Sequence, residues 1–89
     1  MDLKFENSFK RDLKKIKDKN VLAEVKKVIK NLEELNELRN FKGNLKKLRR
    51  GKNFLRIRIG DYRIGLEIEG NTLIFVRILR RKEIYKYFP

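Results

Sequence analysis

The spacing of apolar residues predicts two helices in the first half of the chain. Apolar positions recur every three or four residues over 9–16, and a second, longer stripe covers 22–38. Asn7 or Ser8 precedes the first stripe and is a suitable N-cap. The segment 18–20 interrupts the pattern, so we expect the two helices to form an antiparallel hairpin with a very short joint.

Alternation of apolar and polar residues predicts strands in the remainder. Leu3 and Phe5 fit a short first strand. The three longest alternating runs occupy residues 53–59, 62–69 and 72–81. The stretch FKGNLKKLRRGKN, which precedes them, is either irregular or holds a short strand around Leu45 and Leu48.

Two dipeptides that begin with glycine, Gly60-Asp61 and Gly70-Asn71, separate these runs and are typical of two-residue hairpin turns. With these dipeptides as loops, the register gathers one continuous apolar face, which the helix hairpin can cover. We therefore expect an α+β fold in which an N-terminal helix hairpin packs on a small, mainly antiparallel sheet. At this length we expect residues 1–89 to form a single domain.

The same register collects arginines on the opposite face of the sheet. Arg58 lies opposite Arg63, and Arg56 lies opposite Gly65, which in mid-strand indicates a bulge or the close approach of another group. Like charges that face each other across a sheet are destabilising. Two guanidinium groups held side by side suit a phosphate or a carboxylate, although basic residues on a solvent-facing sheet are also common without such a role.

The charge and composition of the chain narrow the range of functions that it can have. The chain carries 25 Lys and Arg against 12 Asp and Glu, a net charge of +13, and residues 40–89 hold 14 of the basic residues and 4 of the acidic ones. This excess predicts a surface for a polyanion, mainly in the second half. The absence of His and Cys excludes the usual zinc sites and a Ser-His triad. Neither a signal peptide nor a membrane span is apparent, so we expect a cytoplasmic protein.

The order of these elements and three motifs resemble the RelE/ParE superfamily of toxin–antitoxin toxins. The similarity runs from FENSFKRDLKKI to Tyr85, RIGDYR is its most specific part, and ILRRKEIY supplies a closing R-x-x-x-Y spacing. The resemblance implies a messenger-RNA endonuclease that acts in the ribosomal A site without a metal or another cofactor. In such enzymes the ribose 2′-hydroxyl attacks the adjacent phosphate, which leaves a 2′,3′-cyclic phosphate and a 5′-hydroxyl.

The resemblance also implies site residues. The catalytic positions of the family match Arg56, Arg58, Arg63, Arg81 and Tyr85. Simple strand alternation points Arg80 toward Arg58 and Arg63, whereas the family spacing to Tyr85 favours Arg81, which a bulge could reorient. We expect Arg81 at the site and keep Arg80 as its competitor. The basic residues expected to bind RNA around the site are Lys46, Lys47, Arg49, Arg50, Lys52, Arg80 and Lys82.

The general base is the weak point of this assignment. RelE-like proteins carry lysines on the strand before the turn, where this chain has arginines, and arginine is a poor proton acceptor. Either catalysis is mainly electrostatic positioning without a general base among the arginines, or the base lies elsewhere in the chain, with Lys52 as a candidate. Two other functions stay open: a ParE-like inhibitor of DNA gyrase, and a catalytically weak module that binds RNA or the ribosome.

The expected partners are the ribosome, mRNA and a RelB-like antitoxin encoded beside the toxin. The charge of the chain predicts that this antitoxin is acidic. Ile74, Val76 and Ile78 would offer an amphipathic antitoxin helix an apolar stripe beside the arginines, unless Tyr87 and Phe88 cover it. An antitoxin on that stripe would block access of RNA to the arginines.

Overall fold

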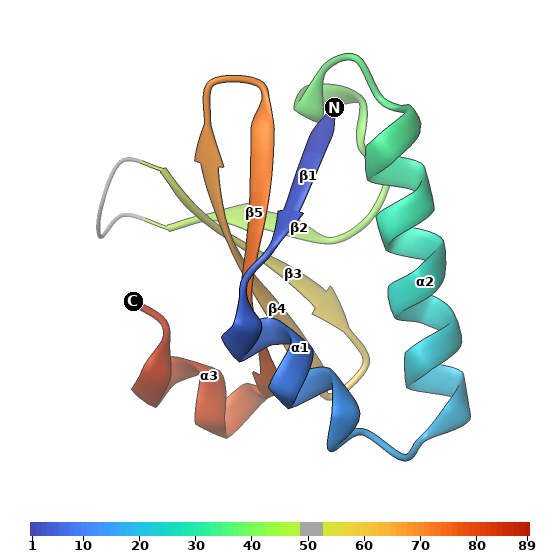
Figure 1. Cartoon of the computed structure of the whole chain (residues 1–89), viewed down its shortest axis with the longest axis vertical. Helices are drawn as coiled ribbons and strands as arrows, with labels where there is room; N and C mark the ends of the chain where they lie inside the picture. The colour runs from blue at the N-terminus through green and yellow to red at the C-terminus, as the bar shows by residue number, and fades with distance from the viewer. Residues whose placement is uncertain (49–52) are drawn as a thin grey trace.

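The computed structural model describes residues 1–48 and 53–89, which form one five-stranded sheet with helices packed around it (Figure 1). In chain order the elements are β1 (Asp2–Phe5), α1 (Asn7–Lys14), α2 (Lys19–Glu34), the short 3-10 helix η1 (Leu38–Asn40), β2 (Leu45–Lys47), β3 (Phe54–Ile59), β4 (Tyr62–Glu69), β5 (Thr72–Arg80) and α3 (Arg81–Tyr87). The strand order is β1-β5-β4-β3-β2. Only the β1–β5 pair in this sheet is parallel, so the expected α+β class with a mainly antiparallel sheet is confirmed.

The β3–β4 hairpin follows the register that the sequence predicts, and β4–β5 follows it from the second turn as far as the Leu66–Phe75 pair. Gly60 and Gly70 have φ angles of +56° and +60° and form the first positions of the two turns. Arg58 pairs with Arg63, and Arg56 pairs with Gly65. A glycine at the first position of a two-residue loop lets the backbone twist match that of the strands, which fixes the register. The register in turn fixes the arginine face, which is the face of the sheet that carries Arg56, Arg58 and Arg63.

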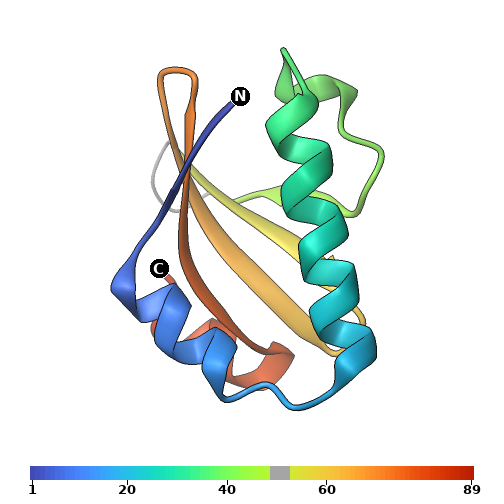
Figure 2. The same ribbon diagram turned by 45° about the vertical axis from the view of Figure 1, so that its right-hand side comes forward.

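The N-terminal helices differ from the predicted antiparallel hairpin. Figures 1 and 2 show α1 and α2 running in clearly different directions, with α2 lying along the sheet and α1 crossing below it. Asp18 begins α2 earlier than expected, because its side chain accepts from the backbone N–H groups of Asn20 at 2.9 Å and Val21 at 3.3 Å. The helix ends at Glu34, so the predicted extension to residue 38 is wrong.

The predicted cap of the first helix is also wrong. Glu6 is the N-cap of α1, and its side chain makes no capping hydrogen bond. The Ser8 hydroxyl instead donates to the backbone carbonyl of Val76 on β5 at 2.6 Å. This small polar residue therefore fastens the helix to the sheet instead of terminating it.

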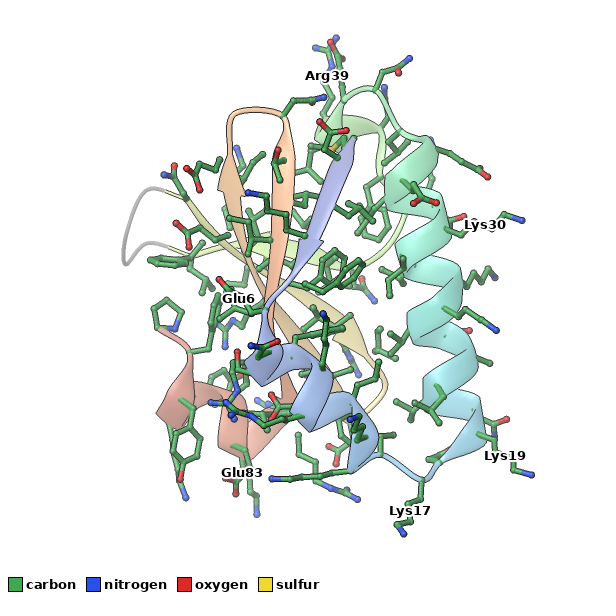
Figure 3. All side chains as sticks on the ribbon, viewed as in Figure 1. Glu6, Lys17, Lys19, Lys30, Arg39 and Glu83 are labelled. Atoms are coloured by element: carbon green, nitrogen blue, oxygen red, sulfur yellow. The ribbon has the colours of Figure 1, made fainter. Side chains whose placement is uncertain are left out.

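The main core lies between α2 and one face of the sheet. Leu32 on α2 and Leu66 on β4 are fully buried, and Phe9 of α1 packs edge-on against Phe75 of β5 with ring centroids 5.3 Å apart. The outer side of α2 is charged, and Figure 3 shows Lys30 extending away from the sheet. This separation of apolar and charged sides places α2 on the face opposite the arginines.

A buried ion pair ties α1 to the edge of β5, beyond the point where β1 ends. Asp12 is only 5% exposed and accepts from Nε and Nη2 of Arg77 at 2.7 and 3.1 Å, as well as from the backbone N–H of Ile78 at 3.1 Å. The hydrogen bond from Arg77 to Asp12 raises the pKa of the arginine. The carboxylate thus satisfies a strand edge that would otherwise lack a partner.

Replacing Asp12 with Ala is expected to lower the free energy of unfolding by about 2–3 kcal/mol, because Arg77 and the Ile78 N–H both lose their acceptor. Urea denaturation measures this loss. The matched control is Glu37→Ala, which breaks the solvent-exposed pair of Glu37 with Arg39 and should change stability by less than about 0.5 kcal/mol. Equal losses in the two variants would contradict the role of the buried pair.

A β-bulge on β5 changes which of its side chains share the arginine face. Phe75 lies opposite Leu66, whereas Arg77 lies opposite Gly65, so Val76 between them has no partner on β4. An extra residue of this kind reverses the alternation of side chains beyond it. The reversal carries every second residue after Arg77 onto the arginine face.

The bulge also overturns the apolar stripe predicted as an antitoxin surface. Ile78 lies in the main core at 1% exposure, and Ile74 is buried on the other face of the sheet. Phe88 is 6% exposed and packs edge-on against Phe54, with ring centroids 5.5 Å apart. Ile74, Val76 and Ile78 therefore form no continuous exposed stripe, and Phe88 of the C-terminal segment packs against Phe54.

Helix α3 is an element that the alternation pattern does not predict. Its seven residues pack against β4 and β5, with Ile84 fully buried. Phe88 follows the helix and lies over Gly65, where a Cβ atom would come within 2.6 Å of the ring. Gly65 is therefore a close-approach glycine, and the space above it receives the end of the chain.

Candidate functional site

An open cleft of about 420 Å³ lies on the arginine face of the sheet. Its walls come from the segment before β2, from β2, β3 and β4, and from α3. The lining residues are Asn44, Leu45, Lys46, Arg56, Arg58, Arg63, Arg81 and Tyr85. All five residues that the resemblance marks as catalytic positions therefore meet in one cleft, although they come from three separate segments of the chain.

The β3–β4 hairpin fixes three of the arginines. Arg56 and Arg58 alternate with buried residues on β3, and Arg63, the second residue of β4, lies directly opposite Arg58. Nη1 of Arg63 donates to the carbonyls of Gly60 and Tyr62, both at 2.9 Å. Burial lowers the pKa of Arg63, and the facing Arg58 lowers it further, but a guanidinium stays charged near neutral pH.

Helix α3 supplies the other two groups. Arg81 and Tyr85 stand four residues apart, on the same side of the helix, and Nε of Arg81 donates to the Tyr85 hydroxyl at 3.3 Å. The Arg56 guanidinium lies 4.7 Å from the centre of the Tyr85 ring. The hydrogen bond from Arg81 lowers the pKa of Tyr85, as do the charges of Arg81, Arg56 and Arg63.

The structure places Arg81 rather than Arg80 at the cleft. Arg81 lines the cleft, whereas Nη1 of Arg80 pairs with Asp61 at 3.1 Å, and its guanidinium lies 5.2 Å from the centre of the Tyr62 ring. The backbone N–H of Arg81 also donates to the Asp61 carbonyl at 2.9 Å. The first hairpin turn thus holds the strand–helix junction, so that Arg81 faces the cleft and Arg80 faces away from it.

Among the described basic residues that we expect to contact RNA, one lines the cleft and the others lie outside it. Lys46 lines the cleft, while Lys47 and Lys82 are exposed outside it. Arg49, Arg50 and Lys52 lie outside the described residues, and so does the suggestion of Lys52 as a base.

Sequence reasoning missed Asn44 and Leu45 as parts of the cleft. Both belong to the stretch that the pattern leaves irregular, and the Asn44 carbonyl accepts from the backbone N–H of Arg58 at 2.9 Å. That hydrogen bond lays the segment along the edge of β3. Only the pairing of β2 with β3 brings these residues to the site, and a strand of three residues leaves a weak alternation signal.

The arrangement is suited to a phosphate of a nucleic acid. Four guanidinium groups face one open cleft, and a phenol oxygen lies among them. Within residues 1–48 and 53–89, no three His, Cys, Asp or Glu side chains cluster as metal ligands would. None of the helices described is both long and apolar enough to span a membrane.

Comparison with known proteins gives consistent matches over nearly the whole chain. The model of the family described as "ParE toxin of type II toxin-antitoxin system, parDE" matches residues 3–85. Toxin RelE3 from Methanocaldococcus jannaschii is 40% identical over 89 residues, with both chains covered in full.

Comparison with solved structures shows that the fold is also shared. The chain is similar to one in the RelB-RelE antitoxin-toxin complex from Methanococcus jannaschii, with 41% identity, a TM-score of 0.84, and 97% and 99% of the two chains covered. It is also similar to a chain of the toxin-antitoxin complex RelBE2 from Mycobacterium tuberculosis, with 26% identity, a TM-score of 0.69, and 90% and 96% covered.

Proposed function

Because this chain belongs to the RelE/ParE superfamily of type II toxin–antitoxin toxins, we propose that it inhibits translation by cutting mRNA on the ribosome. Residues 1–89 would act as a single toxin domain. The observation that carries the proposal is the convergence of four arginines and Tyr85 in one cleft. Cations in that number suit the charge that develops on a phosphate under attack.

In the proposed reaction the ribose 2′-oxygen attacks the adjacent phosphorus, and the bond to the 5′-oxygen breaks. Arg58 and Arg63, which face each other, would hold the equatorial oxygens, and Arg81 would fix the position of Tyr85. Guanidinium groups can stabilise charge but cannot by themselves bring the 2′-oxygen in line. We therefore propose that the ribosome supplies the geometry of the RNA.

Tyr85 is the residue that we propose as acceptor of the 2′-hydroxyl proton. Its pKa is lowered, chiefly by the hydrogen bond from Arg81, so the phenolate forms at a lower pH than in a free tyrosine. The rate of cleavage should therefore rise with pH up to the pKa of Tyr85 and then level off. In Tyr85→Phe this rising limb should be missing, which single-turnover rates between about pH 6 and 10 measure. An unchanged limb in the variant would exclude the phenolate as the base.

Gyrase inhibition is the second candidate, and it is favoured by the description of the matching family model, which names ParE. Primer extension on a translated message, together with a DNA supercoiling assay, separates the possibilities. Cuts in register with the codons of the message that are absent from naked RNA support the endonuclease. A supercoiling defect without cuts supports gyrase inhibition. Protection of the message without cuts supports a module that only binds.

We propose an acidic antitoxin as the protein partner, with the ribosome and mRNA as the targets. Two relatives are known in toxin–antitoxin complexes, one of them a RelB-RelE complex. A chain of net charge +13 should attract a partner of opposite charge, and salt should slow that association. The docking surface of the antitoxin is not the predicted stripe of Ile74, Val76 and Ile78, because these side chains are largely buried.

A further inference from the structure

We propose that Lys46 is the general acid of the cleavage reaction, the group that protonates the 5′-oxygen as it leaves phosphorus. The inference rests on the proposed endonuclease function and deepens it. It gives a catalytic role to a residue that the sequence offers only as an RNA-binding cation.

The pairing of β2 with β3 places Lys46 at the reaction site. Lys46 lies directly opposite Arg56, so the two side chains leave the sheet on the same face, and both line the cleft. The next residue, Lys47, lies opposite Leu55, whose side chain is buried in the main core on the other face. One lysine of this short strand is therefore directed to the arginines, and its neighbour is not.

The chemistry of the lining residues leaves few proton donors. An arginine does not release its proton near neutral pH, and Asn44 and Leu45 do not titrate. Among the described residues that line the cleft, which exclude 49–52, Lys46 and Tyr85 are the two that can exchange a proton. The Tyr85 oxygen already accepts a hydrogen bond from Arg81, which suits it to receive a proton. An ammonium group on a flexible stem is suited to give one.

Tyr85 and Lys46 together balance the proton transfers of the reaction. The 2′-oxygen forms a bond to phosphorus while its proton passes to the Tyr85 phenolate. The electron pair of the breaking P–O bond moves to the 5′-oxygen, which takes a proton from Nζ of Lys46. The products are a 2′,3′-cyclic phosphate, a 5′-hydroxyl, a neutral phenol and a neutral amine. Exchange of one proton each with water returns both side chains to their starting states.

The test compares two leaving groups in single-turnover cleavage on ribosomes programmed with synthetic mRNA. One message carries the normal linkage at the cleaved position, and the other carries a sulfur in place of the 5′-oxygen. A thiolate leaves without a proton, because the pKa of a thiol is about 8.5, far below that of an alcohol. Lys46→Ala and Lys46→Arg should cut the oxygen message about 10²-fold more slowly than wild type, but the sulfur message at close to the wild-type rate.

Lys46→Arg separates proton donation from charge, since it keeps the cation and removes the donor. Lys47→Ala, on the same strand, is the matched control: any loss of RNA contact should affect both messages alike and leave their rate ratio at the wild-type value. Equal slowing of both messages in the Lys46 variants would overturn the proposal and leave Lys46 as a binding cation. An unchanged oxygen rate would also overturn it, while the endonuclease function would stand. Failure of the wild type to cut either message would overturn both.

Discussion

Arg63→Ala is expected to lower the single-turnover rate of mRNA cleavage by about 10²- to 10³-fold and to leave the fold intact. Removal of one fixed hydrogen-bond donor to a developing oxyanion typically costs about 3–4 kcal/mol in the transition state. The stability should change by less than about 1 kcal/mol. The variant gives up two hydrogen bonds to carbonyls of the turn, but it also relieves the repulsion between Arg63 and Arg58.

The control for overall charge is Arg11→Ala. This variant removes an exposed arginine of α1 that does not line the cleft. Both variants lower the net charge by one, so a general electrostatic attraction to the ribosome would weaken them equally. The site assignment requires a large loss in Arg63→Ala alone. Full toxicity of Arg63→Ala, at normal expression, would remove this residue from the catalytic site.

Gly65→Ala is expected to reduce cleavage by about 10²-fold although residue 65 is not assigned a contact with RNA. Its new methyl group would come within 2.6 Å of the Phe88 ring, so the end of α3 must move away from the sheet. Arg81 and Tyr85 stand on that helix, and a displacement of about 1 Å in catalytic groups can cost two orders of magnitude. The loss should appear in kcat, with the melting temperature lowered only moderately.

A double-mutant cycle checks this cause. Phe88→Leu reduces the ring to a smaller apolar side chain, so Gly65→Ala should do less harm in the Phe88→Leu background than alone. Circular dichroism at each step verifies that the sheet is retained. Additive losses would show that the added methyl group acts through something other than the contact with Phe88, and a fully active Gly65→Ala would refute the positioning role of this contact.

The sheet was predictable because its strands alternate and its turns begin with glycine. Gly60 and Gly70 fixed the loops, and the pairing of Arg58 with Arg63 followed. The helices were less predictable, because periodicity shows which face is buried but not which element covers it. Asp18 looked like an interruption but is a cap, and its two backbone hydrogen bonds depend on the local turn of the chain.

The cleft was partly predictable. Arg56, Arg58 and Arg63 follow from local register, whereas the direction of Arg81 depends on the bulge at Val76, which reverses the alternation of β5. Gly65 in mid-strand indicated either a bulge or a close approach, and the structure has both there, but the sequence did not show that Val76 of β5 is the extra residue. Lys46 was recognised only as a basic residue, because its position opposite Arg56 depends on pairing between strands separated in the chain.

The chemistry of the RNA ends tests the central claim most directly. Purified ribosomes that hold a defined mRNA are mixed with the toxin, and both new ends of the RNA are identified by mass spectrometry. The proposed mechanism predicts one cut in the A-site codon, with a 2′,3′-cyclic phosphate and a 5′-hydroxyl, and no such cut in the same RNA without ribosomes. An intact message on ribosomes, or ends that carry a 3′-hydroxyl and a 5′-phosphate, would contradict it.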